Sequence, residues 1–563
     1  MLYPQSNLYR SVTNLNGIWN FKAVEPDYVP TAPLTDGMPM AVPASFNELV
    51  VDKTLCEHVG KVVYEREFSV PIDAEKIYRL RIGATSHKCE IYLNGKKAGT
   101  GLNGFLPIDI PVENLQEKNR LSVVIDNRLN FQTFPAGMIK ENGKQEIKFD
   151  FYNFTGIHRD VLLYSLPKKH IEDIQINTVV GGDYRKITVN VQSNCGKISY
   201  RILDEDGAEV AASKNGALTV ENPKLWSPEH PHLYTLAVET ETDKYEETFG
   251  IRKVSYDENG LLLNGERVYL TGFGMHEDFF LLGKGNNAAV NVRNFELLKW
   301  THANSVRTSH YPYSEEFMSL ADRYGIMVID EVPAVGMNHW EPTFAKTCAN
   351  DETRAIHKEL IRQLLARDKN HPCVVMVSVA NEAATYEKAA RPYFEDVINY
   401  TRKLTDLPIT MTEETKEWEY EGCQTADLVD FIGLNRYFGW YEEHGDLKIG
   451  TRMLVDEFEK WHKRFKKPIL VTEFGADTIE GLHALPSVTF SEEYQREFLE
   501  EYCRVFDTLP YVVGEHVWNF ADFKTKQGTI RVRGNRKGVF TKERQPKLAA
   551  FFLRERWSNK HEK

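Results

Sequence analysis

The chain has 563 residues, enough for three or four domains at a typical size of roughly 150 residues each. It carries 69 basic and 81 acidic residues, a formal net charge of −12, with 42% apolar and 27% charged residues. This composition is typical of a globular protein with large hydrophobic cores, and it excludes a disordered or collagen-like chain. The acidic balance argues against a general nucleic-acid-binding protein, which needs a basic surface.

Neither a membrane segment nor a disulfide framework is expected. No apolar run in the sequence approaches the roughly 20 residues needed to cross a bilayer. Residues 1–6 lack a charged segment followed by an apolar one, so we expect no signal peptide and a cytoplasmic location. The seven cysteines are scattered without a C-x-x-C pair, which argues against disulfides and against a structural zinc site.

The first 254 residues have the pattern of two β-sandwiches. Short runs of β-branched or aromatic residues end at turn residues, and Asn94-Gly95 favours a tight type I′ hairpin. We place a boundary near Pro167, after which a second β block has about the size of an immunoglobulin-like domain. The predicted strands are 62–70, 89–93 and 121–125 in the first block, and 187–191, 197–203 and 233–238 in the second.

From about residue 255 the pattern changes to alternating strands and helices. Amphipathic segments such as 351–368 and 491–506 predict helices, and Ser491 is a good helix cap. Eight strands separated by helices over about 300 residues favour a (β/α)8 barrel, whose active site lies at the carboxyl ends of the strands. The predicted strands are 268–273, 305–309, 326–331, 374–380, 409–412, 431–434, 469–472 and 512–518.

Polar or aromatic residues follow every predicted barrel strand. Glu382 and Glu473 end the apolar fourth and seventh strands, whose ends are expected to face each other across the mouth. Two carboxyl groups about 5–5.5 Å apart are what a retaining glycosidase needs, one to attack the anomeric carbon and one to protonate the leaving oxygen. A single glutamate is more often a salt-bridge partner, but the pair favours catalysis.

Aromatic and basic residues near the same rim are consistent with sugar binding. Tyr437, Trp440, Tyr441 and Trp518 follow strands six and eight, and flat rings match the C–H faces of a sugar. For Trp440, core packing is the preferred interpretation. Residues 531–538 place four cations and an amide in a glycine-bounded loop. This loop either binds a substrate carboxylate through charge-assisted hydrogen bonds or forms a solvated turn.

Six stretches give the chain a specific resemblance to the β-glucuronidases of glycoside hydrolase family 2. The similarity extends from Asn16 to about Trp557 and implies three domains. These are a jelly-roll sugar-binding-like β-sandwich at 1–166, an immunoglobulin-like β-sandwich at 167–254 and a catalytic TIM barrel at 255–563. The stretches are TSHYPY at 308–313, ARDKNHP at 366–372, NRYFGWY at 435–441, TEFG at 472–475, VWNFADF at 517–523 and GNRKG at 534–538.

The resemblance implies a role for each candidate site residue. Glu382 would be the acid/base and Glu473 the nucleophile, while Asn381 would bind the sugar 2-OH. Asn535 and Lys537 match an Asn-x-Lys element that recognises the uronate carboxylate, which favours the binding interpretation of the basic loop. The other matches to sugar-contacting positions are Asp150, His310, Asn435, Tyr437, Tyr441, Trp518 and Arg531. At rest we expect an ionised Glu473 and a protonated Glu382, because desolvation and a neighbouring carboxylate raise the acid's pKa.

Four features depart from the family pattern. Ala383 stands where proline usually follows the acid/base, Val377 where tryptophan is usual, and Met275 where a basic residue is common. The segment 337–351 is shorter than the long active-site loop of some bacterial relatives. A shorter loop implies a more open mouth and a larger aglycone, such as the end of an oligosaccharide.

The leading hypothesis is a retaining exo-β-glucuronidase that hydrolyses small glucuronides or glucuronate-terminated oligosaccharides without a cofactor or metal. His276, Glu277 and His310 lack metal-ligand spacing, so we expect them to organise the glutamates and the sugar. The alternatives are a β-galacturonidase, another related β-glycosidase such as a β-galactosidase, and a non-catalytic carbohydrate-binding protein. Because relatives are often tetramers, a homo-oligomer, either a tetramer or a dimer, is expected.

Overall fold

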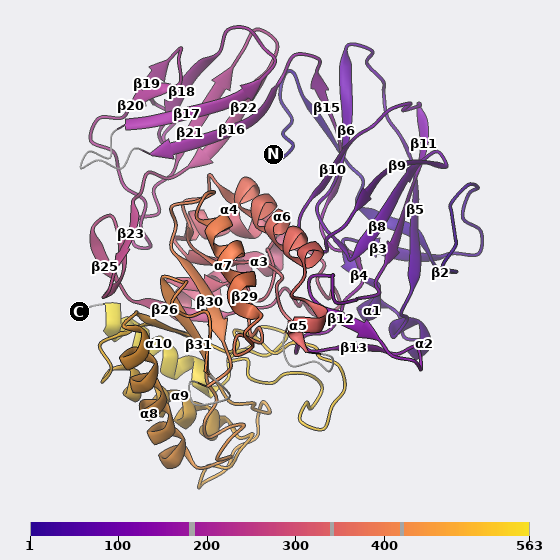
Figure 1. Ribbon diagram of the computed structural model, residues 1–563. Coiled ribbons are helices and arrows are strands. Elements are labelled where there is room, and N and C mark those ends of the chain that lie inside the picture. The colour runs from indigo at the N-terminus through magenta and orange to yellow at the C-terminus, as the bar shows by residue number, and fades with distance from the viewer. Residues whose placement is uncertain (1, 179–185, 338–342, 417–421, 562–563) are drawn as a thin grey trace.

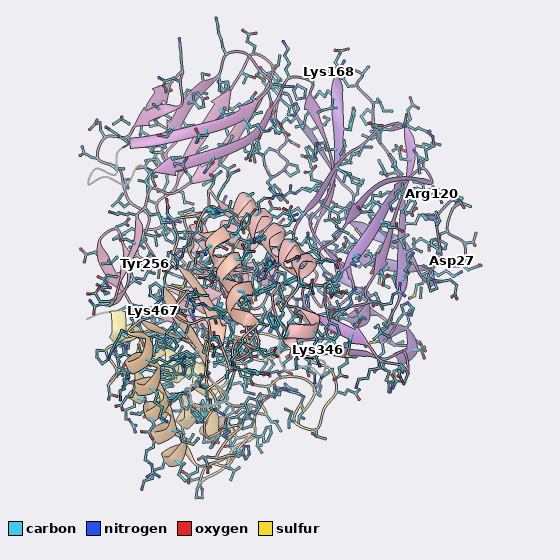
Figure 2. All side chains as sticks on the ribbon, viewed as in Figure 1. Asp27, Arg120, Lys168, Tyr256, Lys346 and Lys467 are labelled. Atoms are coloured by element: carbon cyan, nitrogen blue, oxygen red, sulfur yellow. The ribbon has the colours of Figure 1, made fainter. Side chains whose placement is uncertain are left out.

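The chain folds into two β modules and an α/β barrel in a computed structural model that describes residues 2–178, 186–337, 343–416 and 422–561. Figure 1 shows the first module in indigo and purple, the second in magenta, and the barrel from pink to yellow. Lys168, labelled in Figure 2, lies on the segment that joins the two β modules. The arrangement confirms the predicted fold class.

The first module packs two antiparallel sheets around the buried side chains of Trp19, Phe21 and Tyr64. Its predicted hairpin turn is confirmed, since Asn94 and Gly95 have φ of 52° and 80°. One sheet contains β1 (Ser11–Asn14), β15 (Val161–Pro167), β6 (Lys76–Ile82) and β10 (Ile108–Pro111). The other contains β3 (Met38–Val42), β2 (Gly17–Val24), β5 (Lys61–Ser69), β11 (Lys118–Asp126), β8 (Lys88–Leu93) and β9 (Lys96–Gly101). Short elements at its edge are β4 (Ala44–Ser45), α1 (Phe46–Leu49), α2 (Lys53–Cys56), β7 (Thr85–Ser86), β12 (Gly137–Ile139), β13 (Gln145–Ile147) and β14 (Gly156–Ile157).

The second module is a smaller sandwich with a separate core that includes Ile174, Ile202 and Leu236. One sheet contains β16 (Ile171–Thr178), β17 (Lys186–Ser193) and β20 (Ala217–Thr219), and the other β19 (Glu209–Ser213), β18 (Ser199–Leu203), β21 (Tyr234–Glu239) and β22 (Lys244–Phe249). A three-stranded sheet of β23 (Val254–Asp257), β24 (Gly260–Leu263) and β25 (Glu266–Val268) leads into the barrel.

Eight parallel strands close the barrel in chain order, as the sequence predicts. The predicted helix 351–368 is α6, and Ser491 caps α9 by accepting a hydrogen bond from the amide of Tyr494. The strands are β26 (Leu270–Gly274), β27 (Ser305–Arg307), β28 (Met327–Glu331), β29 (Val374–Asn381), β30 (Ile409–Glu413), β31 (Phe431–Asn435), β32 (Ile469–Glu473) and β33 (Val512–Val517). The helices are α3 (Ala288–Trp300), α4 (Glu315–Tyr324), α5 (Phe344–Thr347), α6 (Asp351–Asp368), α7 (Ala390–Thr401), α8 (Leu447–Phe465), α9 (Glu492–Phe506) and α10 (Leu548–His561).

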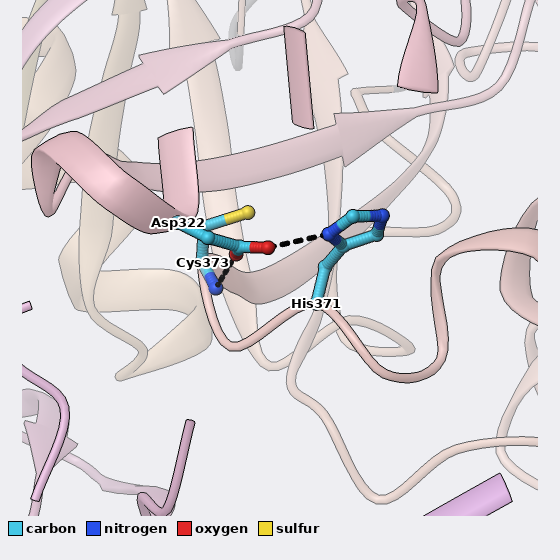
Figure 3. Close-up of side chains that lie close together, drawn as sticks. All are labelled: Asp322, His371 and Cys373. Atoms are coloured by element: carbon cyan, nitrogen blue, oxygen red, sulfur yellow. Dashed lines mark hydrogen bonds and ion pairs between the residues drawn. The ribbon is translucent and has the colours of Figure 1, made fainter. Parts of the chain in front are cut away.

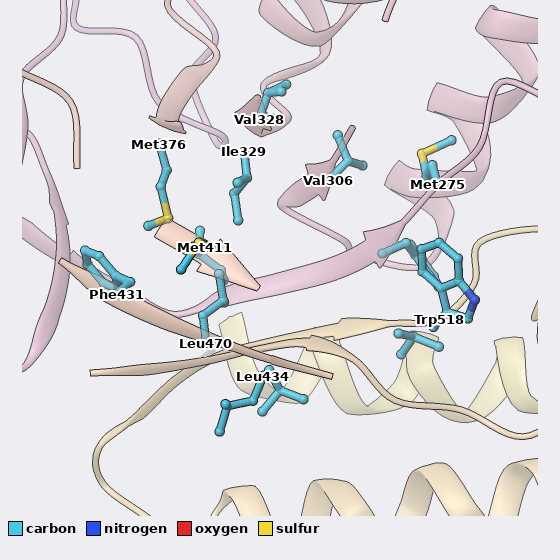
Figure 4. Packing of buried hydrophobic residues seen from close by; sticks show 14 of the residues in the cluster. Met275, Val306, Val328, Ile329, Met376, Met411, Phe431, Leu434, Leu470 and Trp518 are labelled. Carbon is cyan, nitrogen blue, oxygen red and sulfur yellow. The ribbon is translucent and has the colours of Figure 1, made fainter. Parts of the chain in front are cut away.

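Apolar side chains fill the barrel, and polar side chains end six of its eight strands. Figure 4 shows Ile329, Met376, Met411 and Leu470 gathered in the buried interior. Burial of these side chains excludes water beneath the rim, so polar groups above them interact in a medium of low polarity. The strand-ending residues are Arg307, Glu331, Asn381, Glu413, Asn435 and Glu473.

The first module covers one side of the barrel rim. Arg159 forms a buried ion pair with Glu277 at 3.0 Å. The amide of Tyr152 donates to the carbonyl of Lys524 at 2.9 Å, and that of Ala136 to the carbonyl of Val335 at 3.1 Å. These contacts hold the segment 147–150 beside the ends of the barrel strands.

The structure also bears on two predicted absences. All seven cysteines are unpaired, and five of them are buried. In the part of the chain that the structure describes, no helix is both long enough and apolar enough to cross a membrane.

Candidate active site

A cavity of about 650 Å³ opens at the carboxyl ends of the barrel strands. It collects eleven of the twelve predicted site residues: Asp150, His310, Asn381, Glu382, Asn435, Tyr437, Tyr441, Glu473, Trp518, Arg531 and Asn535. Lys537 is fully buried behind the residues that line the cavity, with its Nζ 2.8 Å from the hydroxyl of Tyr441. A position at the strand ends is where barrel enzymes carry out their chemistry.

Side chains from two strand ends, those of β27 and β31, surround the carboxylate of Glu473. The hydroxyl of Tyr437 donates to Oε2 at 2.6 Å, and the guanidinium of Arg307 donates to Oε1. The Nε2 atom of His310 lies 3.7 Å from the same Oε1. These contacts fix both oxygens of a residue that is only 4% exposed.

Arg307 and Glu331 are site residues that the sequence reasoning missed. Arg307 is fully buried and bridges Glu473 to Glu331, whose Oε2 also accepts from Ser378 at 2.7 Å. Although burial acts in the opposite direction, Arg307 and His310 lower the pKa of Glu331 to about 2. The ionised Glu331 therefore orients Arg307 and His310. Each of the two residues ends a barrel strand, which places it at the rim, but the strand pattern does not show its partners on other strands.

Glu382 occupies a contrasting environment. Its backbone is left-handed, with φ of 51°, and its Oε1 accepts a hydrogen bond from the amide of Asn435 at 2.7 Å. Burial, followed by the charges of Glu414 and Glu473, raises the pKa of Glu382 well above its usual range. This environment favours the protonated, neutral carboxyl.

Asn435 links the two candidate glutamates. Its Nδ2 donates to Glu382, while its Oδ1 accepts from the hydroxyl of Thr472 at 2.8 Å. Thr472 immediately precedes Glu473 on β32. Asn381 lies beside the same group, 3.4 Å from Asn435 Nδ2 and 3.3 Å from Arg307. The two carboxyl groups and two amides therefore form one connected group on the cavity floor.

The basic loop turns toward the cavity. Arg531 pairs with Asp150 of the first module at 2.6 Å, and Asn535 donates to the same carboxylate at 2.8 Å. Lys537 pairs with Asp477, a third residue that the sequence reasoning missed. Asp477 also accepts from the amide of Arg536 at 2.8 Å. These bonds fix several N–H donors at one end of the cavity.

The aromatic residues divide as the sequence predicts. Trp518 lines the cavity and stacks on His310, with ring centroids 5.1 Å apart. Tyr441 is exposed on the cavity wall. Trp440 is instead buried and packs against Phe490 at 5.0 Å, which agrees with its expected core role.

His276 and Glu277 differ from His310 in what they contact. His276 bonds the hydroxyl of Tyr311 through Nδ1 at 2.9 Å and packs edge-on against Trp518. Glu277 pairs with Arg159 and accepts from the amide of Ser314, so it ties the first module to the barrel. The positions that depart from the family pattern, Val377, Met275 and Ala383, are all buried.

One group in the described ranges has the spacing of a metal site: Asp322, His371 and Cys373 (Figure 3). Its polar atoms are partnered, since His371 Nδ1 lies 2.5 Å from Asp322 Oδ2 and the amide of Cys373 donates to Oδ1 at 3.0 Å. Although burial opposes it, Asp322 raises the pKa of His371 to about 9. The ion pair and the bond from the amide of Cys373 hold the start of β29 against α4, so we assign this group as a structural ion pair.

Comparison with known proteins identifies the family. The barrel model of glycosyl hydrolases family 2 matches residues 254–561, the model named glycosyl hydrolases family 2 matches 169–252, and the sugar binding domain of that family matches 12–167. The chain belongs to family 2 of the glycosyl hydrolases. This family 2 enzyme is therefore a glycoside hydrolase.

Relatives resemble this family 2 hydrolase over nearly its whole length. A β-glucuronidase of Paenibacillus borealis is 44% identical, with 99% of this chain and 98% of that protein covered. The structure of an uncultured Clostridium sp. β-glucuronidase superposes with a TM-score of 0.95 at 44% identity, covering 99% and 100% of the two chains. A Ruminococcus gnavus β-glucuronidase in complex with D-glucaro 1,5-lactone gives 0.93 at 38% identity, covering 99% of both.

Proposed function

We propose that this glycoside hydrolase is a retaining exo-β-glucuronidase that acts on small glucuronides or glucuronate-terminated oligosaccharides. One observation carries the proposal: Glu382, Glu473 and the basic loop converge on a single cavity. The names of the relatives described above agree with it. Acid/base glycoside cleavage by two carboxyl groups needs no cofactor.

The first step forms a covalent intermediate. An oxygen of Glu473 attacks the anomeric carbon while Glu382 transfers its proton to the glycosidic oxygen, and the bond between that carbon and oxygen breaks. The aglycone leaves as an alcohol, and the sugar remains esterified to Glu473. Hydrogen bonds from Tyr437 and Arg307 orient the attacking carboxylate.

The second step releases the sugar. Glu382, now ionised, takes a proton from water, and the water oxygen displaces Glu473 from the anomeric carbon. Two displacements at one carbon retain its configuration. Proton NMR of the first product tests this part of the proposal, because β-glucuronate is expected and initial α-glucuronate would contradict it.

Recognition of the uronate is assigned to the fixed donors at one end of the cavity. Asn535, Lys537 and Arg531 would hold the substrate carboxylate through charge-assisted hydrogen bonds. Asp150 would bind sugar hydroxyls from the first module, and Asn381 would bind the 2-OH. His310, Tyr441 and Trp518 would pack against or bond the same sugar.

Paired substrates test the specificity directly. We expect the nitrophenyl β-D-glucuronide to be cleaved much faster than the galacturonide or the glucoside, and Lys537→Met to lower kcat/KM for the glucuronide roughly 100-fold. The matched control is Lys542→Met, because Lys542 pairs with Asp278 outside the cavity. An equal loss on the neutral glucoside would contradict uronate recognition by Lys537. Equal or higher rates on the galacturonide would favour the β-galacturonidase alternative.

Two further parts of the proposal rest on the resemblance alone. The short loop expected to open the mouth includes residues 338–342, which lie outside the described residues. Hydrolysis rates of oligosaccharide glucuronides, compared with those of nitrophenyl glucuronides, test whether the enzyme prefers the larger aglycone. A homo-oligomer, dimer or tetramer, is expected, and light scattering measures its mass.

A further inference from the structure

A third carboxylate, that of Glu414, lines the active-site cavity together with Glu382 and Glu473. Its position follows from the strand pairing. Asn381 of β29 lies opposite Thr412 of β30, and the amide of Glu382 donates to the carbonyl of Thr412 at 2.9 Å. Glu414 is two residues beyond Thr412, so the chain delivers it to the rim beside Glu382.

The intervening residue, Glu413, points away from the cavity. Its carboxyl is buried and accepts hydrogen bonds from Thr385, from Cys423 at 3.3 Å and from Thr425 at 3.3 Å. Because successive side chains of an extended segment point to opposite sides, this anchoring directs Glu414 into the cavity. Because Glu413 is held in the interior, Glu414 is the one of these two consecutive glutamates that lies near Glu382.

We propose that Glu414 is a positioning residue whose negative charge holds the proton on Glu382 until the aglycone departs. This inference rests on the proposed function, because it needs Glu382 to be the acid/base. The inference assigns a further residue to the reaction at the same cavity and does not propose a second site. Glu414 is exposed on the cavity wall, whereas Glu382 is half-buried in the same cavity.

The groups that face Glu382 come from several strands. Glu473 on β32 disfavours ionisation of Glu382, Arg307 on β27 favours it, and the amide of Asn435 also favours the ionised form. Tyr437 interacts electrostatically with both glutamates. Nearby on the segment that carries Glu414, the cation Lys416 pairs with Glu442. After burial, Glu414 is the largest contributor to the raised pKa of Glu382.

Glu414 differs from Glu473 in that the reaction leaves its charge unchanged. Once Glu473 is esterified it loses its charge, and its effect on Glu382 disappears. The charge of Glu414 persists through both half-reactions. It therefore keeps Glu382 protonated for the first step and strongly basic for the second.

The test is the pH profile of kcat/KM on nitrophenyl β-D-glucuronide. Its alkaline limb reports the acid of the free enzyme. Glu414→Gln is expected to move this limb to lower pH by about one pH unit, the size of a single-charge interaction in a partly solvated site. Glu414→Asp keeps the charge and should restore most of the shift. Glu480→Gln, which removes the same charge from an exposed site on a different cavity, should leave the limb in place.

Glu382→Gln separates the two ways in which the inference can fail. If the alkaline limb is lost in Glu382→Gln but unmoved in Glu414→Gln, Glu382 is the acid and the role of Glu414 is wrong. If the limb persists in Glu382→Gln, the acid assignment is wrong and the inference is overturned with it. A limb that moves in Glu414→Gln and returns in Glu414→Asp supports the inference, even where the variants differ in stability.

Discussion

The two ends of the barrel contain similar residues in different arrangements. At the carboxyl end, Arg307, His310, Glu331 and Glu473 form a buried group beneath an open cavity. At the amino end, Asp322 of α4 pairs with His371, which lies just before β29. Both groups contain a histidine beside a carboxylate and both line a cavity, but only the first lies at the carboxyl ends of the barrel strands, in the cavity that Glu382 also lines.

The amino-end group joins domains. The indole of Trp226, in the second module, donates to the carbonyl of Asp322 at 2.8 Å. Asn370 bonds the backbone of β16 on both sides, accepting from Ile176 and donating to Ile174, each at 3.0 Å. A histidine–carboxylate pair that lines a cavity is therefore not by itself evidence of a reactive site, because at this end its neighbours join the domains.

The largest difference between the two ends of the barrel is expected when the charge of Glu473 is removed. Glu473→Gln should lower kcat by more than about 10⁴-fold, because the attacking oxygen is lost and the other groups act through it. Binding of a glucuronate analogue should remain measurable by calorimetry. Glu480→Gln is the matched charge control and should keep full activity. Retained turnover in Glu473→Gln would show that a different carboxylate is the nucleophile.

Hydrogen-bonded arginines at the two ends allow a paired test. Arg307→Met leaves Glu331 and Glu473 without their cation, so we expect a loss of about 3–5 kcal/mol in unfolding free energy and at least a 100-fold loss of kcat. Arg252 donates to the carbonyls of Pro372 and Val374 at the amino end. Arg252→Met should cost about 1–3 kcal/mol with kcat unchanged. Urea unfolding and kinetics at a temperature where both variants are folded measure the difference.

The sequence predicts the barrel and most of the cavity because both depend on local patterns. Apolar runs that end in a carboxylate identify β29 and β32 with Glu382 and Glu473, and the family stretches supply the uronate loop. The sequence does not reveal Arg307, Glu331 and Asp477, because their importance depends on distant partners. Arg307 pairs with residues 24 and 166 positions away, and Asp477 pairs with a lysine 60 positions away. Pairing across the barrel rim is a tertiary property, so no local spacing encodes it.

The smallest effect on turnover is expected at His371. The ion pair with Asp322 raises the folded-state pKa of His371 to about 9, against the opposing effect of burial, from an unfolded value near 6.5. A pKa raised on folding contributes stability that is complete below about pH 6.5 and is lost as the pH rises through about 9.

His371→Gln should therefore lower the unfolding free energy by about 2 kcal/mol at pH 6 and by clearly less at pH 9.5. The kcat of the folded enzyme should change less than about twofold, because His371 precedes β29 at the end away from the cavity. Urea titrations at the two pH values, each with wild type alongside, measure the difference. A loss that is equal at both pH values would mean that packing of the ring, rather than its charge, stabilises this end. A large fall in kcat would mean that the two ends of the barrel are coupled.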